Sequence, residues 1–126
     1  MSRKVLLIED EPNITEAIRF LLTREGWHVE THAEGSDAFE LIMASRPDLL
    51  ILDVMLPGKS GMDILRELRE QEDTRKLPVL MLTARGQLRD REMAEKAGVS
   101  RFMTKPFSNT EVVTAVRDLH AQASKA

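Results

Sequence analysis

Three short segments of this chain are hydrophobic at every position. They cover residues 5–8, 49–52 and 79–82. Each segment is too short for a helix, and the lack of alternation indicates a strand that is covered on both faces. Residues 27–31 and 101–104 mix polar and apolar positions, as is typical of strands at the edges of a sheet.

Helical periodicity fills the intervals between these strands. Apolar residues recur at i, i+3 and i+4 in five segments, which cover residues 14–22, 38–42, 62–68, 88–97 and 112–119. Gly26 and Gly98 follow two of these segments as helix stops, and Ser108 precedes the last segment as an N-cap.

Strands that alternate with helices predict an α/β fold with a parallel sheet and right-handed crossovers. Three central and two edge strands favour the flavodoxin-like order 2-1-3-4-5, which makes the architecture a five-stranded (βα)5 three-layer sandwich. We expect a single domain over residues 1–126, with its core over about 4–119 and a frayed tail over 121–126.

Composition narrows the possible functions. The chain has 126 residues, of which 42% are hydrophobic and 31% charged, as in an ordinary globular domain. It has no cysteine, which excludes disulfides, thiolate metal sites and a cysteine nucleophile. The net charge of −3 predicts no nucleic-acid surface, and no apolar run approaches a membrane span. We therefore expect a cytoplasmic protein that binds neither nucleic acid nor membrane.

Polar residues collect where the predicted strands end. Glu9 and Asp10 follow the first strand, Asp53 ends the third, Thr83 follows the fourth and Lys105 follows the fifth. In the predicted order these strands are neighbours, and the carboxyl ends of parallel strands share one edge of a sheet. We therefore expect these side chains to converge on one rim.

The chemistry of such a rim favours a phosphoryl group and a metal ion. Like charges on Glu9, Asp10 and Asp53 would destabilise the fold unless a cation lies between them. Oxygen ligands without His or Cys select Mg²⁺ before Zn²⁺. A metal ion, a lysine and a hydroxyl suit a phosphoryl group that a carboxylate attacks. The acidic first loop lacks the glycines of a nucleotide-binding loop, which argues against NAD, FMN or ATP.

At these positions the chain resembles the response-regulator receiver domains of two-component signalling. The resemblance rests on four motifs, at residues 7–12, 52–61, 81–85 and 104–107. It implies that Asp53 is the phosphoacceptor and that Asp10, Asp53 and the Met55 backbone carbonyl bind Mg²⁺ or Mn²⁺. Glu9 would bind the ion through water.

The resemblance also implies a switch. Lys105 would pair with the phosphoryl oxygens, Thr83 and Phe102 would move after phosphorylation, and the Lys105–Pro106 peptide bond would be cis. Met55 and Arg85 would flank the site. A histidine kinase or phosphotransfer protein would supply the phosphoryl group. The face of the fourth helix, fifth strand and fifth helix would then bind a downstream protein effector. The domain would be a signalling switch and no enzyme, since it would catalyse only its own phosphorylation and slow dephosphorylation.

One departure concerns pairing between receivers. Ser100 and Arg101 stand where many receivers of the winged-helix branch carry two acids. Arg91 and Glu111 still fit part of that pairing scheme, so a phosphorylation-dependent homodimer stays open. The chain is either a stand-alone receiver or a fragment of a longer regulator.

Two other functions compete with this one. A small-molecule phosphatase with an aspartyl-phosphate intermediate would carry an acid two residues after its nucleophile, where this chain has Met55. A scaffold that works without phosphorylation would be expected to lose an acid, the threonine or the lysine, and this chain keeps them all.

Single residues also have plainer interpretations. Asp10 or Glu11 could cap a helix, and Asp53 could be a buried, hydrogen-bonded carboxylate. Thr83 could cap a loop, Phe102 could be edge-strand core and Lys105 a surface lysine. The three histidines show no metal-ligand spacing and are expected at the surface or sheet edge, far from the acids; they are His28, His32 and His120.

Overall fold

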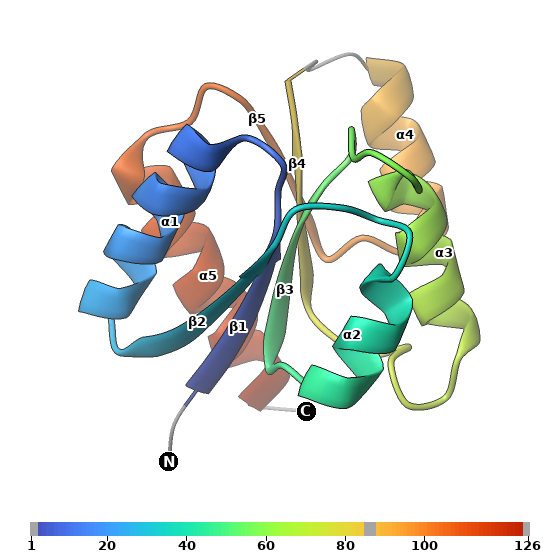
Figure 1. Cartoon of the computed structure of the whole chain (residues 1–126), viewed down its shortest axis with the longest axis horizontal. Helices are drawn as coiled ribbons and strands as arrows, with labels where there is room; N and C mark the ends of the chain where they lie inside the picture. Colours follow the sequence, from blue (N-terminus) through green and yellow to red (C-terminus); the bar gives the residue numbers. More distant parts are fainter. Residues whose placement is uncertain (1–2, 85–87, 125–126) are drawn as a thin grey trace.

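Strands and helices alternate along the whole chain in a computed structural model that describes residues 3–84 and 88–124 (Figure 1). The strands are β1 (Arg3–Ile8), β2 (Trp27–His32), β3 (Leu49–Asp53), β4 (Val79–Thr83) and β5 (Arg101–Thr104). The helices are α1 (Pro12–Arg24), α2 (Ala38–Ser45), α3 (Gly61–Glu70), α4 (Leu88–Ala97) and α5 (Asn109–Ser124). Residues 121–124, for which the sequence predicts fraying, belong to α5, and the rest of that predicted tail lies outside the described residues.

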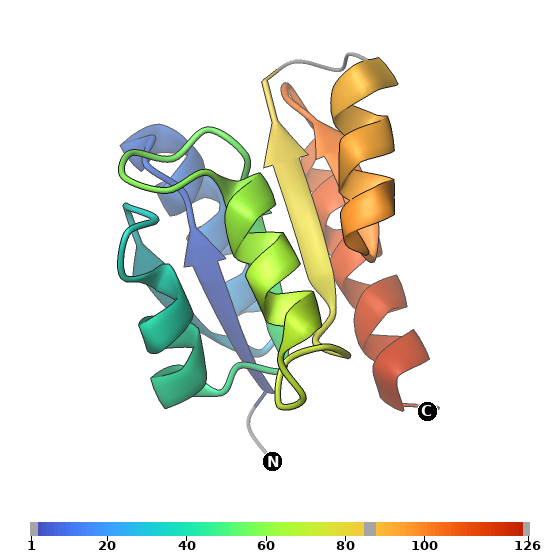
Figure 2. The same ribbon diagram turned by 90° about the vertical axis from the view of Figure 1, so that its right-hand side faces the viewer.

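The sheet confirms the predicted topology. Its five strands are parallel and lie in the order β2-β1-β3-β4-β5. Helices α1 and α5 cover one face, and α2, α3 and α4 cover the other, which gives the three layers (Figure 1). All strand carboxyl ends therefore point to the same end of the molecule (Figure 2).

The central strands are buried on both faces. Every residue of β3 and β4 is buried, which explains why their sequences show no alternation. Leu7 and Ile51 pack into the cluster under α1 and α5, whereas Leu6 and Leu50 pack into the cluster under α2, α3 and α4. The two apolar clusters hold the sheet rigidly between its helices.

Local signals set the ends of several helices. Gly26 follows α1 with φ of 94° and Gly98 follows α4 with φ of 92°, in the left-handed region that favours glycine. Ser108 and Glu111 form a reciprocal capping box at α5: Glu111 N donates to Ser108 Oγ over 3.1 Å, and Ser108 N donates to Glu111 Oε1 over 2.9 Å. Sequence patterns did not predict the cap of α3, where Ser60 Oγ accepts a hydrogen bond from Asp63 N.

In the described part of the chain, no helix has both the length and the apolar character that a membrane span requires.

Truncating the centre of the sheet should cost much of the stability. Leu50 is fully buried on β3, so Leu50→Ala should lower the free energy of unfolding by about 2–5 kcal/mol through lost burial and a cavity. Phe20→Ala is the matched control, because Phe20 is 61% exposed and its loss should cost less than about 1 kcal/mol. Urea denaturation followed by circular dichroism measures both values, and equal losses would contradict this packing.

Candidate functional site

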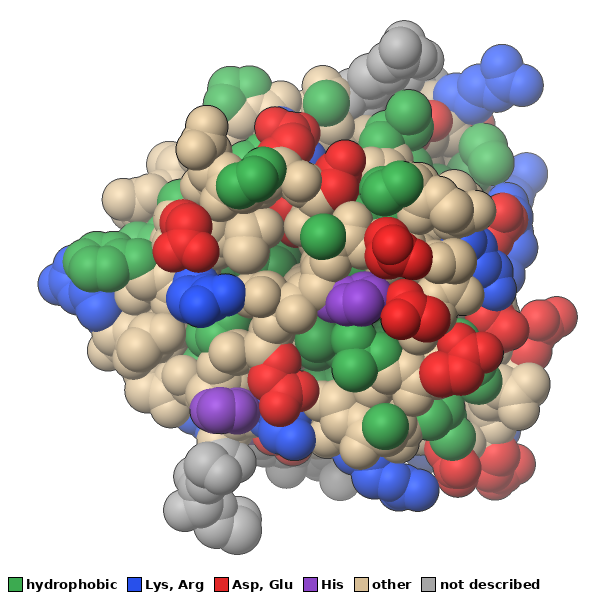
Figure 3. All heavy atoms as spheres, viewed as in Figure 1, with side chains coloured by type: hydrophobic (Ala, Val, Ile, Leu, Met, Phe, Trp, Pro, Cys, Tyr) green, Lys and Arg blue, Asp and Glu red, His purple; other side chains and the backbone are tan. Residues whose placement is uncertain are grey.

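The predicted rim exists at the carboxyl ends of the strands. Glu9 and Asp10 directly follow β1, and Asp53 is the last residue of β3. Ile8 pairs with Leu52, so the residues that follow them, Glu9 and Asp53, lie side by side. Figure 3 shows acidic side chains at this end of the molecule, at the top of the view.

Three carboxylates meet at the rim. One oxygen each from Glu9, Asp10 and Asp53 lies within 4.8 Å of the others. Glu9 and Asp53 are each only 2% exposed, whereas Asp10 faces solvent. Buried charges of one sign at this range repel one another strongly because little water screens them.

Lys105 supplies the positive charge that faces these acids. Its Nζ lies 2.9 Å from Glu9 Oε1, 3.4 Å from Asp53 Oδ2 and 3.3 Å from Glu11 Oε1. Burial acts to lower the pKa of Lys105, but Glu9, Asp53 and Glu11 together raise it above its ordinary value. The ammonium therefore stays charged.

The backbone of Lys105 is hydrogen-bonded to the neighbouring strand, since Lys105 N donates a hydrogen bond of 2.7 Å to Thr83 O. The Lys105–Pro106 peptide bond is cis, as predicted. The contact of Lys105 with Glu11 is new, because the sequence assigns Glu11 no role at the site. Glu11 is the N-cap residue of α1, and its separation of 94 residues along the chain from Lys105 hides the contact from sequence patterns.

The acid with the strongest perturbation is Asp53. Burial, and next the neighbouring charge of Glu9, raise the pKa of Asp53 to about 7, and Lys105 opposes the shift only in part. Met55 N donates to Asp53 Oδ1 over 3.4 Å, which also favours the ionised form weakly. In the absence of a metal ion, the carboxyl of Asp53 is therefore partly protonated near neutral pH.

The two side-chain oxygens of Glu9 differ in their hydrogen bonding. Glu9 Oε2 accepts a hydrogen bond from Glu11 N over 3.0 Å. Among the described residues, Glu9 Oε1 is a buried oxygen that accepts no well-aligned hydrogen bond, even though Lys105 Nζ is close to it. A buried carboxylate oxygen in this state, beside two further carboxylates, fits a hard divalent ion.

The two residues of the predicted switch lie on neighbouring strands. Thr83 is buried at the end of β4, next to the strand that carries Asp53. Phe102 is half-buried on β5, and the guanidinium carbon of Arg91 lies 5.5 Å from the centroid of its ring. Arg85, which the sequence places beside the site, lies outside the described residues.

The prediction that the histidines lie far from the acids is wrong for His32. Glu9 N donates to His32 O over 3.0 Å, and His32 Nε2 lies 2.6 Å from Asp37 Oδ1. The parallel pairing of β1 with β2 puts His32 opposite Ile8, so both strands end at the same level. His28 is exposed, and His120 packs on the Trp27 ring.

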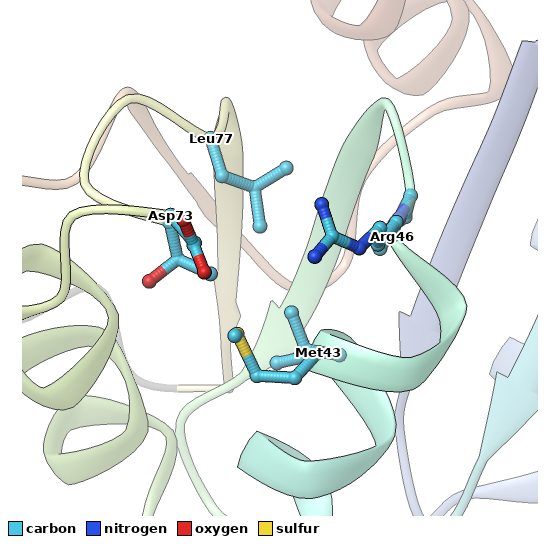
Figure 4. A pocket seen from close by; sticks show the side chains of 7 residues that line it. Met43, Arg46, Asp73 and Leu77 are labelled. Atoms are coloured by element: carbon cyan, nitrogen blue, oxygen red, sulfur yellow. The ribbon is translucent and has the colours of Figure 1, made fainter.

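Two open hollows flank the acidic cluster. One of about 410 Å³ is lined by Glu9, Asp10 and His32, among others, and one of about 460 Å³ is lined by Glu11, Lys105 and Phe107, among others. A tighter cavity of about 100 Å³ lies at the amino ends of β3 and β4, where Met43, Arg46, Asp73 and Leu77 surround it (Figure 4). That cavity is remote from the rim and brings no set of carboxylates together.

A flavodoxin-like sheet with clustered acids at its carboxyl edge defines a known class of α/β domain, and comparisons narrow the class to one family. A sequence profile described as the response regulator receiver domain matches residues 5–117. The chain therefore belongs to the receiver domains of two-component response regulators.

Solved structures of this family superpose on almost the whole chain. A protein from Chloroflexus aurantiacus described as a response regulator is 32% identical over 96% of this chain and 99% of its own, with a TM-score of 0.91. The receiver domain of a histidine kinase from Syntrophus aciditrophicus is 30% identical over 99% and 95%, with a TM-score of 0.91.

A further relative contains a metal ion. The receiver domain of a sensor histidine kinase from Pseudomonas aeruginosa is 30% identical over 96% of this chain and 99% of its own, with a TM-score of 0.87. That structure has a magnesium ion coordinated in its active-site cleft.

The raised pKa of Asp53 predicts an unusual pH dependence of stability. Without divalent ions, the folded protein keeps a proton on Asp53 between about pH 4 and pH 7 that the unfolded chain has released. The contribution of Asp53 to stability is therefore present below about pH 4 and is lost as the pH rises towards 7. Relative to wild type, Asp53→Asn should raise the free energy of unfolding by about 1–3 kcal/mol over the range from pH 5 to pH 8.

Urea denaturation in EDTA at pH 5 and at pH 8 measures this difference in the free energy of unfolding. Asp73→Asn is the matched control, because Asp73 is an exposed carboxyl away from the rim, and it should follow wild type at both pH values. If Asp53→Asn also tracks wild type, the carboxyl of Asp53 is not perturbed by its surroundings.

Proposed function

We propose that Asp53 of this receiver domain accepts a phosphoryl group from a phosphohistidine on a histidine kinase or phosphotransfer protein in the cytoplasm. The observation that carries the proposal is the convergence of Lys105 Nζ on Glu9 and Asp53, at 2.9 and 3.4 Å, beside the carboxylate of Asp10. A nucleophile, a cation and acidic side chains that can bind a metal ion are the parts that phosphoryl transfer requires.

The same residues would hold a divalent ion. Asp10, Asp53 and the backbone carbonyl of Met55 would bind Mg²⁺, with Glu9 acting through water, and Mn²⁺ would take the same oxygen ligands. Bound Mg²⁺ would neutralise negative charge on the phosphoryl oxygens and on the acids around them. The carboxylate cluster, the buried Glu9 Oε1 and the magnesium ion in a 30% identical receiver support this assignment.

Asp53 would act as the nucleophile. A lone pair on its carboxylate oxygen forms the new O–P bond while the P–N bond to the donor histidine breaks, and the electron pair of that bond returns to the imidazole nitrogen. Lys105 supplies a charged ammonium to the phosphoryl oxygens, since its pKa is held above the ordinary value. Because Asp53 is buried, few water molecules surround its carboxylate before the reaction.

The phosphorylated domain would then change its surface. Thr83 would turn its hydroxyl to the phosphoryl group, and Phe102 would rotate into the space beside it. That rotation would end the contact between Phe102 and Arg91 and so alter the face formed by α4, β5 and α5. A downstream protein effector would bind this face, because the face exposes different side chains before and after phosphorylation.

The same face gives less support to pairing of two receivers. Arg101 forms an ion pair of 3.3 Å with Asp118 of the same chain, and Glu111 is engaged by the backbone of Ser108. A phosphorylation-dependent homodimer would need these internal contacts to be exchanged. We therefore favour a separate protein as the effector.

We propose a signalling switch and not an enzyme that turns over small molecules. A phosphatase with an aspartyl-phosphate intermediate needs a general acid close to its nucleophile. Two residues after Asp53 this chain has Met55, an apolar side chain that is 65% exposed. Turnover of a small phosphomonoester would contradict the proposal.

Phosphorylation should depend on Asp53 and on a divalent ion. Incubated with acetyl phosphate and Mg²⁺, wild type should gain the mass of one phosphoryl group, and EDTA should prevent the gain. Asp53→Ala should gain nothing because the attacking carboxylate is gone, whereas the exposed-site control Asp73→Ala should behave as wild type. Intact-protein mass spectrometry reads all four samples. A phosphorylated Asp53→Ala protein refutes the proposed acceptor, and an unmodified wild type favours a phosphorylation-independent scaffold.

Mg²⁺ affinity should distinguish the roles of two neighbouring exposed acids, Asp10 and Glu11. Asp10→Asn should weaken Mg²⁺ binding about tenfold or more, since a charged ligand is lost. Glu11→Gln should change the affinity much less, because Glu11 contacts Lys105 and is not a proposed ligand. Isothermal titration calorimetry gives both constants, and a larger loss in Glu11→Gln would reverse the assignment of the two acids.

A further inference from the structure

The loop that follows β2 lies against the loop that follows β3. In Figure 2 the first loop, residues 33–37, runs beside the second, residues 54–60, at the end of the sheet that carries the rim. Gly35 N donates a hydrogen bond of 2.9 Å to Pro57 O, which joins the two backbones directly. The second loop begins immediately after Asp53 and contains Met55.

Gly35 occupies a position where no side chain fits. A Cβ atom on Gly35 would lie 2.0 Å from Lys59 O and 2.9 Å from Lys59 C, which are backbone atoms that can move only if the loop itself shifts. Gly35 is buried and is not among the glycines with the positive φ that disfavours other residues. Space, and not backbone torsion, is therefore what requires glycine here.

Two further contacts tie residues 54–60 in place. A Cβ on Gly58 would lie 3.0 Å from Ser36 Cβ, so the residue after Gly35 also packs on this loop. At the far end of the loop, Gly61 N donates to Val54 O over 2.9 Å, and a Cβ on Gly61 would lie 2.1 Å from Asp53 O. The loop is thus held at its end by Gly61 and along its length by residues 35–36.

The loop after β2 is itself anchored to the first acidic segment. Its start is fixed where His32 O accepts the hydrogen bond from Glu9 N. Its two ends are joined where His32 Nε2 lies 2.6 Å from Asp37 Oδ1. Residues 32–37 therefore touch both of the segments that carry acidic side chains of the rim.

We propose that Gly35 is a positioning residue for the metal site: its missing side chain lets the loop after β2 support residues 54–60 and so fixes the backbone that carries the Met55 carbonyl. Gly35 acts through its contacts with Pro57 and Lys59 and touches neither metal nor phosphoryl group. The inference rests on the proposed function, because it requires that the Met55 carbonyl binds the ion.

Gly35→Ala tests the inference through metal affinity. The added methyl group must push Lys59 O away, so Mg²⁺ affinity should fall about tenfold, as when a group that supports a metal ligand is lost. Gly26→Ala is the matched control, because Gly26 has φ of 94° and lies at the opposite end of β2 from the rim. It should lower the free energy of unfolding and leave Mg²⁺ affinity unchanged.

Calorimetric titration with Mg²⁺ and urea denaturation of the three proteins separate the outcomes. Wild-type affinity in Gly35→Ala overturns the inference and leaves the proposed function standing. An equal loss of affinity in Gly26→Ala also overturns it, because general destabilisation would then explain the effect. A wild type that does not bind Mg²⁺ contradicts the proposed function itself.

Hydrogen exchange in the wild type decides the question if Gly35→Ala fails to fold. The Gly35 amide bonds to Pro57 O, so its exchange should slow when Mg²⁺ holds residues 54–60. The Gly98 amide, which bonds to Glu95 O far from that loop, should exchange at the same rate with and without Mg²⁺. Slower exchange at Met55 with no change at Gly35 overturns the inference.

Discussion

Repulsion between buried carboxylates is the constraint on which the rest of this structure depends. Glu9 and Asp53 are both removed from water, Asp10 adds a third negative group, and Lys105 offsets only part of their charge. In a poorly screened site such an excess must be met by a proton, a metal ion or a change of structure. The raised pKa of Asp53 is the first of these responses, and the proposed magnesium site is the second.

The fold makes this arrangement possible because it separates stability from function. The apolar strands, packed on both faces, supply enough buried surface to hold the rim together against its own charge. Parallel pairing then delivers the ends of β1, β3, β4 and β5 to one edge. The residues of the candidate site lie at strand ends and in the loops beyond them, where the backbone can be adjusted without disturbing the core.

Much of this could be predicted from the sequence, for physical reasons that are specific to each element. Residues 49–52 and 79–82 are hydrophobic throughout because both faces of β3 and β4 are buried. The end of each strand then located Asp53, Thr83 and Lys105, because parallel topology leaves little freedom in where strand ends meet. The contacts of these side chains, unlike their neighbourhood, needed coordinates.

What the sequence did not predict depends on contacts between segments that are far apart along the chain. His32 joins the rim through strand pairing and Glu11 through its place at the N-cap of α1, and neither leaves a periodic signal. The close approach of Gly35 to Lys59 is likewise invisible in a residue that could equally serve a turn. The edge position predicted for residues 27–31 is confirmed, but Trp27 in that strand is only 4% exposed because it packs on His120 of α5.

The most direct measurement is the free energy of unfolding of the wild-type chain at pH 7.5 in EDTA, in saturating Mg²⁺, and in NaCl of matched ionic strength. If negative charge at the rim must be offset by a divalent ion, Mg²⁺ at about one hundred times its dissociation constant should stabilise the protein by about 2.7 kcal/mol. NaCl should have little effect, because screening acts weakly on buried charges. Equal stability in Mg²⁺ and NaCl would contradict the account.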